Sequence, residues 1–450
     1  MSAAQVESRL GNQELAVAEA TRTLVVCPYP SAFRLGADRA NARAPEARRE
    51  EACGLALAIN LNVVGCEPAT LNLIRPATYL GKGKVAEIAA LVQEREAGLV
   101  VMDCPLSPVQ QRNLEKAFKA KVIDRTGLIL EIFGRRARTR EGALQVELAH
   151  LAYQKSRLVR SWTHLERQRG GFGFLGGPGE TQIETDRRLI QERIIRIERD
   201  LEGVKRTRAL HRASRADVPY PIVALVGYTN AGKSTLFNRL TRAEVVAADM
   251  LFATLDPTMR QLELPHGGAA ILSDTVGFIS DLPTTLISAF RATLEEVRAA
   301  DVILHVRDIA HADSEAQSRD VAAILVELGV EGGGERVIEV WNKLDKLDGE
   351  HRAALLEGRA AEAGAPLAVS ALTGEGVGGL LGAIEARLAR GRSLLALELD
   401  GADGQGLHWL YEHTEVMARE QRDDGRISLK VRVAPEQLER VARRFGAATG

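Results

Sequence analysis

The sequence is poor in the features that define several common classes of protein. Its 450 residues include only four cysteines, which lie in the first quarter of the chain without a CxxC pair. This spacing argues against a disulfide framework or a zinc site and fits a reducing compartment. No apolar run is long enough to span a bilayer, and the polar N-terminus does not resemble a signal peptide. We therefore expect a cytoplasmic protein without integral membrane insertion, while peripheral membrane association stays open.

An excess of charge is also lacking. Lys and Arg together number 59, and Asp and Glu number 60, so the formal net charge is −1. A surface that binds nucleic acid must then be local, because the charge of the whole chain favours no partner. The His and Cys residues show no spacing typical of a protein-only metal site, so we expect any metal ion to arrive with a ligand.

The order of strand-like and helix-like segments predicts an α/β protein of several domains. We expect a flexible N-terminus over residues 1–21 and a small α/β domain with a mostly parallel sheet over residues 22–138. A doubly wound, mostly parallel sheet is expected over residues 218–392. Residues 393–450 are expected to form a small α+β tail, with a helix from about Gln405 to Asp423.

Residues 139–217 are expected to form an antiparallel helical hairpin, because two stretches carry apolar residues at coiled-coil spacing. The apolar residues are Leu144, Leu148, Leu151, Leu158, Trp162 and Leu165 in the first stretch, and Ile190, Ile194, Ile197, Leu201 and Val204 in the second. Lys155 interrupts the first series. The Gly-rich segment 169–180, RGGFGFLGGPGE, would be the exposed tip of this hairpin.

The hairpin is also rich in arginine, which raises the question of a nucleic-acid partner. The residues concerned are Arg157, Arg160, Arg167, Arg169, Arg187 and Arg188. They are compatible with solvated helix faces, and the tip is compatible with a flexible linker. Because a linker needs neither Phe172 nor Phe174, we favour a binding loop that contacts RNA.

The segment GYTNAGKST matches the phosphate-loop pattern GxxxxGK[ST] between a predicted strand and a predicted helix. Its glycines let backbone N–H groups close around phosphate oxygens, and the helix N-terminus adds its dipole. Lys233 is expected to reach the β- and γ-phosphates, and Ser234 is expected to bind Mg²⁺. The expected nucleotide contacts are Gly227, Tyr228, Thr229, Asn230, Ala231, Gly232, Lys233, Ser234 and Thr235.

Two further segments are the expected switches, LFATLDPT and DTVGFISDLP. Asp274 would hold Mg²⁺ through water, and the Gly277 amide would contact the γ-phosphate. Thr254 is our choice to complete the Mg²⁺ shell, and Thr258 is the less favoured candidate. Phe278 follows DTVG and cannot orient water by hydrogen bonding, so we expect slow intrinsic hydrolysis. The expected catalytic residues are Lys233, Thr254 and Gly277, and the expected Mg²⁺ ligands are Ser234, Thr254 and Asp274.

The motif NKLD predicts that the nucleotide is GTP. Asp345 is placed to accept from the ring N–H and the exocyclic amine of guanine, a pair of donors that adenine lacks. Asn342 would tie this loop to the phosphate loop, and the stem of Lys343 would cover one face of the base. Backbone groups of the SAL motif would read the guanine oxygen, and its residues are Ser370, Ala371 and Leu372. Each motif lies at a strand end, where such sheets bind ligands.

Together with GGPGETQIETDRR, these motifs resemble the HflX family of GTPases. Four upstream segments agree with that resemblance: GKGKV, LSPVQQRNLE, VIDRTGLILEIF and QVELAHLAY. The resemblance covers the chain from about residue 22 to about residue 390, and the tail matches only in general form. It implies an N-terminal α/β domain, a helical hairpin, a GTPase domain and a variable C-terminal piece.

The resemblance also implies a function. Members of the family bind the large ribosomal subunit and separate stalled or idle 70S ribosomes into subunits, particularly under stress such as heat. The tip at residues 169–180 would approach the rRNA of the peptidyl-transferase region. Several members carry a basic residue in the tip, whereas this chain has Phe172, Phe174 and Leu175, so stacking would replace charge there. Some members bind ATP in the N-terminal domain, but no phosphate-loop pattern supports that here. We expect a monomer.

Two other functions fit parts of the sequence. A GTP-dependent signalling switch would recruit a protein or membrane partner through the hairpin, without a ribosome. A small-molecule kinase would need only the phosphate loop, and NKLD argues against it. Among the remaining residues, His305 and Trp341 are expected to lie in the core. Gly81 to Lys84 is either a phosphate-binding loop or a basic turn before a helix, and we assign it no ligand.

Overall fold

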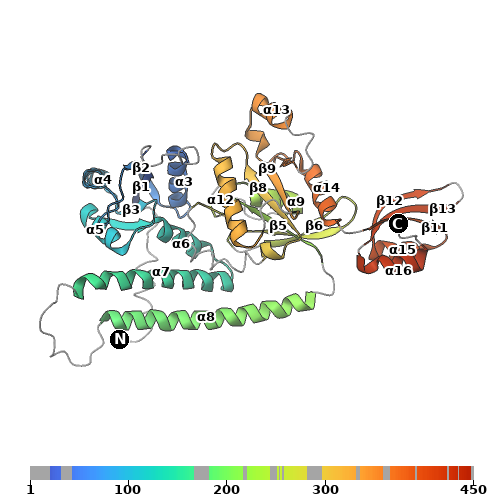
Figure 1. Ribbon diagram of the computed structural model, residues 1–450, viewed down its shortest axis with the longest axis horizontal. Helices are drawn as coiled ribbons and strands as arrows, with labels where there is room; N and C mark the ends of the chain where they lie inside the picture. Colours follow the sequence, from blue (N-terminus) through green and yellow to red (C-terminus); the bar gives the residue numbers. More distant parts are fainter. Residues whose placement is uncertain are drawn as a thin grey trace.

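The computed structural model describes three β-sheets and a pair of long helices (Figure 1). The described residues are 21–31, 43–166, 182–215, 220–243, 251–252, 254–255, 258–280, 296–330, 335–357, 365–390, 393–422, 425–433 and 435–446. Within them, no helix combines the length and the apolar character needed to cross a membrane. The same residues contain no cluster of three His, Cys, Asp or Glu side chains suited to a metal ion.

The first sheet is parallel throughout, as the sequence predicts, with strand order β2-β1-β3-β4. Its elements are β1 (Arg22–Pro30), α3 (Pro45–Leu57), β2 (Asn62–Leu71), α4 (Lys82–Glu94), β3 (Leu99–Met102), α5 (Pro108–Phe118), β4 (Lys121–Asp124) and α6 (Arg125–Arg136). Helix α5 begins with a capping box between Ser107 and Gln110, and Asp124 caps α6. Buried side chains of α3 and α6 and those of α4 and α5 belong to two separate apolar clusters.

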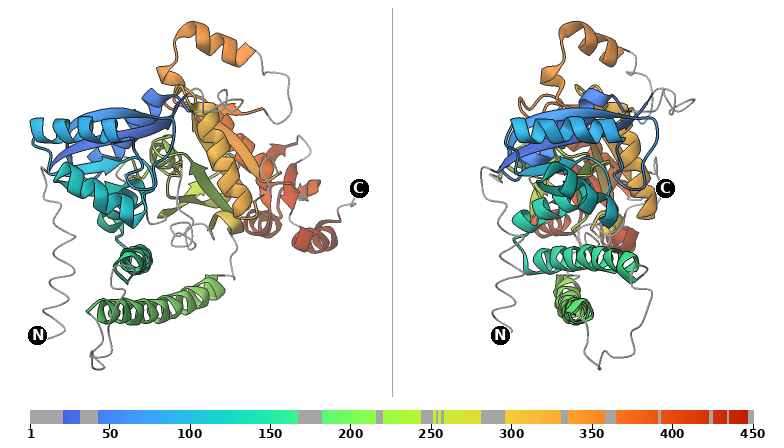
Figure 2. Two further views of the ribbon diagram at one scale, coloured as in Figure 1. Left: turned by 60° about the vertical axis from the view of Figure 1, so that its left-hand side comes forward. Right: turned by 90° about the vertical axis from the view of Figure 1, so that its left-hand side faces the viewer.

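Helices α7 (Arg140–Glu166) and α8 (Gln182–Arg215) are the two predicted long helices. They contact each other through pairs such as Arg193 and Glu147, whose Nη2 and Oε1 atoms lie 2.8 Å apart. The Lys155 amine, at the interrupted position, donates to Gln191 across the pair. Figure 2 shows that the helices cross at an angle, so the pair is less regular than the predicted coiled coil. The predicted tip at residues 169–180 lies outside the described residues.

Helix α7 is held by a second set of contacts, which explains its direction. Val146 and Ala149 belong to the buried cluster that contains the α6 side chains. The Tyr153 hydroxyl donates to Asp124 at 2.6 Å, and the Arg157 guanidinium pairs with the same carboxylate at 2.5 Å. Arg157 also lies over the Tyr153 ring. In this arrangement Arg157 joins α7 to the N-terminal sheet, so it is not one of the free RNA contacts that we considered.

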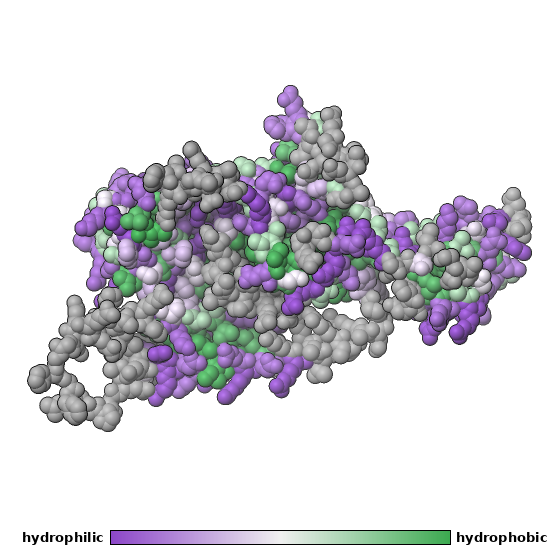
Figure 3. Space-filling model, in the orientation of Figure 1, coloured by the Kyte–Doolittle hydropathy of each residue, from purple (hydrophilic) through white to green (hydrophobic). Residues whose placement is uncertain are grey.

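Hydrophilic residues cover much of the visible outer edge of the molecule (Figure 3).

The second sheet has strand order β10-β9-β8-β5-β7-β6, and only its edge strand β6 is antiparallel to its neighbour. This is the doubly wound, mostly parallel sheet that the sequence predicts. Its elements are β5 (Ile222–Gly227), α9 (Lys233–Thr241), β6 (Thr258–Glu263), β7 (Ala269–Asp274), β8 (Val302–Asp308), α12 (Ser314–Glu327), β9 (Val337–Asn342), η2 (Leu344–Lys346), α13 (Gly349–Glu357), β10 (Leu367–Ala368) and α14 (Val377–Leu388). The strands β7 and β6 lie on one side of β5, and β8, β9 and β10 lie on the other, so the strand order switches at β5. In such sheets the ligand binds in the crevice outside the carboxyl end of the strand at the switch point.

His305 lies on the central strand β8 with only 6% of its surface exposed, as expected for a core residue. Trp341, which lies opposite Arg307 on the neighbouring strand β9, is also buried, as expected. Burial lowers the pKa of His305 to about 4, although Glu339 opposes this shift. The unfolded chain takes up this proton near the ordinary value of 6.5. Between these two pH values the unfolded state holds more protons, so the stability of the fold decreases as the pH falls.

We therefore expect His305→Leu to reduce the acid sensitivity of the fold. Between pH 7 and pH 5, the wild type should lose about 2 kcal/mol more of its unfolding free energy than the variant. Urea unfolding followed at both pH values measures this difference, and comparison with the variant removes the contribution of other titrating groups. Equal losses in the two proteins would show that His305 does not titrate in this way.

The third sheet forms the tail and has the antiparallel order β11-β13-β12. Its elements are β11 (Ser393–Asp400), α15 (Gly404–His413), β12 (Glu415–Gln421), β13 (Arg426–Val433) and α16 (Pro435–Phe445). The predicted helix from Gln405 to Asp423 is therefore wrong in its second half. Thr414 has an extended backbone that ends α15, and the following residues pair with β13. Tertiary pairing here outweighs a local sequence that is compatible with a helix.

Candidate nucleotide-binding site

The phosphate loop connects β5 to α9 in the crevice of the second sheet. Gly232 has a φ of +88°, and a Cβ at this position would lie 2.2 Å from the Nδ2 atom of Asn342, so only glycine fits. Ser234 and Thr235 then lie in the first turn of α9, whose N-terminal N–H groups face the crevice. The sequence Thr229, Asn230, Ala231 forms the bend, in which Asn230 takes a φ of +60°.

The Lys233 side chain lies along this loop and is buried. Its amine donates to the carbonyl oxygens of Gly227, at 3.1 Å, and of Tyr228, at 2.8 Å. Burial lowers the pKa of Lys233 to about 8, although Asp274 opposes the shift. Only the backbone of Tyr228 faces the crevice, because its phenol points towards the first sheet. A cation fixed in this way is suited to bind phosphate oxygens.

Three oxygen-bearing side chains meet beside Lys233. The Ser234 hydroxyl donates to Asp274 Oδ2 at 2.8 Å, and the Thr254 hydroxyl donates to the same oxygen at 2.9 Å. The two hydroxyl oxygens are themselves 2.9 Å apart. Asp274 Oδ1 is buried without a hydrogen-bond partner among the described residues. Thr258, the less favoured candidate, instead begins β6. Such a set of hard oxygens fits Mg²⁺, which binds through few protein ligands and keeps several waters.

Gly277 and Phe278 lie directly against the phosphate loop. A Cβ on Gly277 would lie 2.8 Å from the Thr229 side chain and 3.1 Å from the Lys233 amine. The Phe278 amide donates to the Gly227 carbonyl at 3.1 Å, and the Thr229 amide donates to the Phe278 carbonyl at 2.7 Å. The DTVG segment therefore adjoins the region in front of Lys233 where a terminal phosphate would be bound.

The predicted guanine motifs meet at the other end of the loop. Asn342 Nδ2 donates to the Ala231 carbonyl at 2.9 Å, which ties NKLD to the phosphate loop. The Ala371 amide donates to Asn342 Oδ1 at 3.0 Å, and the Ser370 hydroxyl donates to Asp345 Oδ1 at 2.5 Å. The Ala371 amide is thus already engaged, while the Leu372 side chain is exposed.

Two residues that the sequence motifs do not include hold these loops. Arg239, on α9, donates to the carbonyl oxygens of Ala371, at 3.1 Å, and of Leu372. Asp308, at the end of β8, pairs with Lys343 at 2.7 Å. Neither residue belongs to a recognisable motif, and only the folded structure reveals these contacts.

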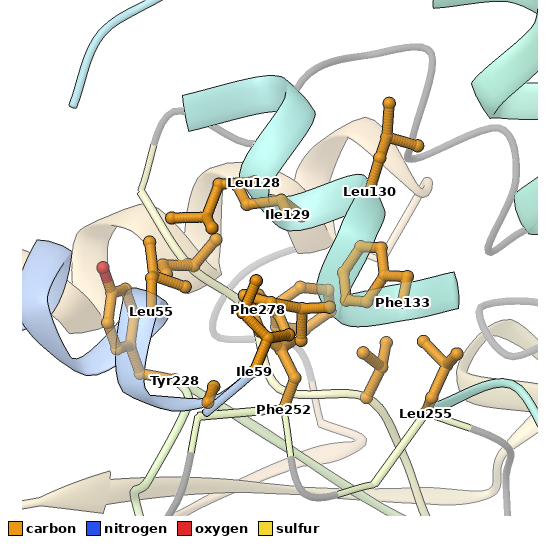
Figure 4. Close-up of a cluster of buried hydrophobic side chains, with 14 of the residues drawn as sticks. Leu55, Ile59, Leu128, Ile129, Leu130, Phe133, Tyr228, Phe252, Leu255 and Phe278 are labelled. Atoms are coloured by element: carbon orange, nitrogen blue, oxygen red, sulfur yellow. The ribbon is translucent and has the colours of Figure 1, made fainter. Parts of the chain in front are cut away.

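The opposite side of the switch segments is buried against helices α3 and α6 of the N-terminal α/β unit (Figure 4). Phe278 is only 1% exposed and belongs to the same apolar cluster as Phe252, Leu255 and the α6 side chains. The rings of Phe252 and Phe133 are 4.7 Å apart in an edge-to-face arrangement. Leu251 lies 3.2 Å from where a Cβ on Gly54 would be. Both predicted switch segments therefore contact the N-terminal α/β unit.

A charged network borders this apolar contact. The Tyr228 hydroxyl donates to Glu51, and it accepts from the Ser280 amide at 2.8 Å and from Arg43 at 3.0 Å. Arg125 pairs with Glu51 at 2.5 Å and donates to the Ser280 carbonyl at 3.0 Å. Burial alone would raise the pKa of Glu51, but Arg125 and Arg43 lower it below its ordinary value.

Comparisons with known proteins agree with this arrangement. Four family models match successive parts of the chain: "GTP-binding GTPase N-terminal" at residues 46–134, "GTP-binding GTPase Middle Region" at 136–215, "50S ribosome-binding GTPase" at 222–343 and "HflX C-terminal domain" at 355–450. The last match extends the similarity into the tail, which we expected to agree only in general form.

Full-length relatives are also similar. "GTPase HflX" of Magnetococcus marinus is 53% identical over 394 residues, which cover 87% of this chain and 89% of the relative. "GTPase HflX" of Escherichia coli is 46% identical over 359 residues, which cover 80% and 83%. A solved structure of a GTP-binding protein from Sulfolobus solfataricus in complex with GDP is 22% identical, with a TM-score of 0.42 over 82% of this chain and 99% of that one.

Proposed function

The chain belongs to the HflX family of GTPases, and from that premise we propose that it binds the large ribosomal subunit in its GTP form and separates 70S ribosomes into subunits. The observation that carries the proposal is the match of residues 222–343 to a family described as a 50S ribosome-binding GTPase. We place this activity in the cytoplasm and connect it with the rescue of stalled or idle ribosomes under stress.

The phosphate end of the site supports the catalytic part of the proposal. Ser234, Thr254 and Asp274 are the residues that would hold Mg²⁺, which neutralises phosphate charge when it is bound. Lys233 would bind the β- and γ-phosphates, and the Gly277 amide would donate to the γ-phosphate. Asn342, Lys343 and Asp345 would bind guanine, with the backbone of residues 370–372 at the base oxygen.

The position of Phe278 supports the proposal that fast hydrolysis needs a partner. Its ring is buried against the N-terminal unit and offers no hydrogen bond to a water molecule. A glutamine at the equivalent position in other GTPases orients the attacking water. We therefore propose that the large subunit stimulates hydrolysis by rearranging the switch segments. In this scheme, binding of the GTP form drives splitting, and hydrolysis resets the protein.

The hairpin of α7 and α8 supports the choice of partner. Arg187 and Arg188 are exposed on α8, near the segment that connects the two helices. We propose that the tip at residues 169–180 approaches the rRNA of the peptidyl-transferase region. Phosphate contacts from the arginines would make binding dependent on salt.

The proposal is tested by measuring GTP turnover by the full-length protein alone, with large subunits and with small subunits. We expect stimulation of about tenfold or more by large subunits and none by small subunits, in line with the effect of a partner that completes a GTPase site. Lys233→Ala, which removes the phosphate-binding amine, should remove the stimulated rate. A protein that binds GTP tightly but is not stimulated by either subunit would instead be a signalling switch.

A further inference from the structure

One ion pair beside the guanine motifs joins Lys343 of NKLD to Asp308, which belongs to none of the sequence patterns. Asp308 is the last residue of β8 and lies directly opposite Asn342, the first residue of NKLD, on the neighbouring strand. Its Oδ2 atom is 2.7 Å from the Lys343 amine. The two side chains are only 13% and 15% exposed, so the pair is largely shielded from water.

The Asp308 carboxylate is fixed by its own turn. Its Oδ1 atom accepts from the Ala310 amide at 3.1 Å, which leaves Oδ2 directed at the lysine. The amide of Ile309, the residue after Asp308, donates to the Asn342 carbonyl at 3.2 Å and holds the ends of β8 and β9 together. The carboxylate therefore has a defined position before any nucleotide is bound.

Lys343 is constrained at both ends of its side chain. Its backbone is in the left-handed region, with a φ of +68°. Its Cε atom lies 3.9 Å from where a Cβ on Gly232 would be. The methylene stem thus passes the phosphate loop, and the amine ends at Asp308.

From this geometry we propose that Asp308 is a positioning residue for guanine recognition, which acts by holding the Lys343 stem extended against the bound base. The inference rests on the proposed function, because it requires that NKLD binds guanine. A free lysine side chain loses rotamer entropy when it is fixed against a bound base. The ion pair removes much of this cost in advance, and it keeps the amine away from the apolar face that the purine covers.

The test is a double-mutant cycle on the full-length protein, with fluorescent mant-GDP and Mg²⁺ as the probe. Asp308→Asn keeps an oxygen that can accept from the Ala310 amide but loses the charge that holds Lys343. We expect this change to raise the Kd for mant-GDP about tenfold, as for loss of a shielded and preorganised ion pair. Lys343→Ala should raise the Kd at least as much. The double variant should bind within about twofold of Lys343→Ala, because interacting residues are not additive.

Asp348→Asn is the matched control, because it makes the same chemical change three residues after Asp345. Asp348 is exposed and pairs only with His351 among the described residues, so its change should leave the Kd unaltered. The value of kcat at saturating GTP should also change less than about twofold in Asp308→Asn, because the lost contact is to the base and not to the reacting phosphate.

Two results would overturn the inference. An unchanged Kd in Asp308→Asn would show that the pair does not support binding. Fully additive losses in the double variant would show that Asp308 acts through the structure of β8 and not through Lys343. A wild type that binds ADP as well as it binds GDP would contradict the proposed guanine site itself, which is a different outcome.

Discussion

An Asp345→Asn variant is expected to lose its affinity for guanine nucleotides and to gain affinity for xanthine nucleotides. The Asp345 carboxylate accepts the Ser370 hydroxyl at 2.5 Å and lies in the NKLD loop that Asn342 ties to the phosphate loop. An amide cannot accept from both donors of guanine, and its NH₂ group would face the guanine amine. Xanthine carries an oxygen at that position, which accepts from the amide.

We expect the Kd for GDP to rise at least about 100-fold in this variant, because the bound guanine would keep donors that no longer have an acceptor. The Kd for XDP should fall by a similar factor. Competition against mant-GDP and mant-XDP measures both changes in one preparation. Restored turnover of XTP provides the control for correct folding. An Asp345→Asn protein that binds GDP as tightly as the wild type would contradict our assignment of this loop to the base.

The nucleotide motifs could be predicted from sequence because each one is short and lies at the end of a strand. A strand, a glycine bend and a helix bring Lys233 and Ser234 together locally, so their spacing alone defines their geometry. The position of Thr254 does not follow from local geometry in this way, because only the fold brings its hydroxyl to Asp274. The position of NKLD beside the phosphate loop also followed from its motif. The contact of Asp308 did not, because Asp308 reaches Lys343 only through the pairing of β8 with β9.

The contact between the N-terminal unit and the switch segments could not be predicted. In the sequence, Glu51 resembles any charged residue on an amphipathic helix. Tyr228 occupies a position of the phosphate-loop pattern at which any residue is allowed. Their side chains meet across 177 residues of sequence. A pattern of local periodicity says nothing about such a distant pairing. The helix predicted for the β12 segment was wrong for the same reason. Pairing with strand β13, and not the local sequence, determines the conformation of this segment.

Replacement of Arg125 by methionine is expected to cause the second large effect. Arg125 is 3% exposed and pairs with two carboxylates, Glu51 on α3 and Asp103 after β3. It also donates to the Ser280 carbonyl of the second switch segment. Methionine has a similar shape but leaves both carboxylates buried without this cation. Breaking a buried ion pair from one side costs about 3–5 kcal/mol, so we expect a loss of unfolding free energy of that size.

The pH dependence of this loss identifies its cause. In the wild type the guanidinium groups hold the pKa of Glu51 below its ordinary value, so the stabilisation is present above that value and is lost as the pH falls through the lowered pKa. In Arg125→Met, Glu51 keeps Arg43 but loses the larger of its two favourable charges. Burial already raises the pKa of Asp103 in the wild type, and loss of Arg125, its main opposing charge, would raise it further. Asp103 would then take up a proton on folding, and the deficit relative to the wild type should shrink as the pH is lowered from 7 to 5.

Urea unfolding of both proteins at pH 7 and pH 5 measures this deficit. Arg112→Met is the matched control, since Arg112 is an exposed residue on α5 and its replacement should change the unfolding free energy by less than about 0.5 kcal/mol. A second variant, Glu51→Gln with Arg125→Met, removes one of the uncompensated charges and should recover part of the stability. A deficit that is the same at both pH values and is not recovered by Glu51→Gln would mean that Arg125 contributes through packing, and that the charged network does not hold the N-terminal unit against the switch segments.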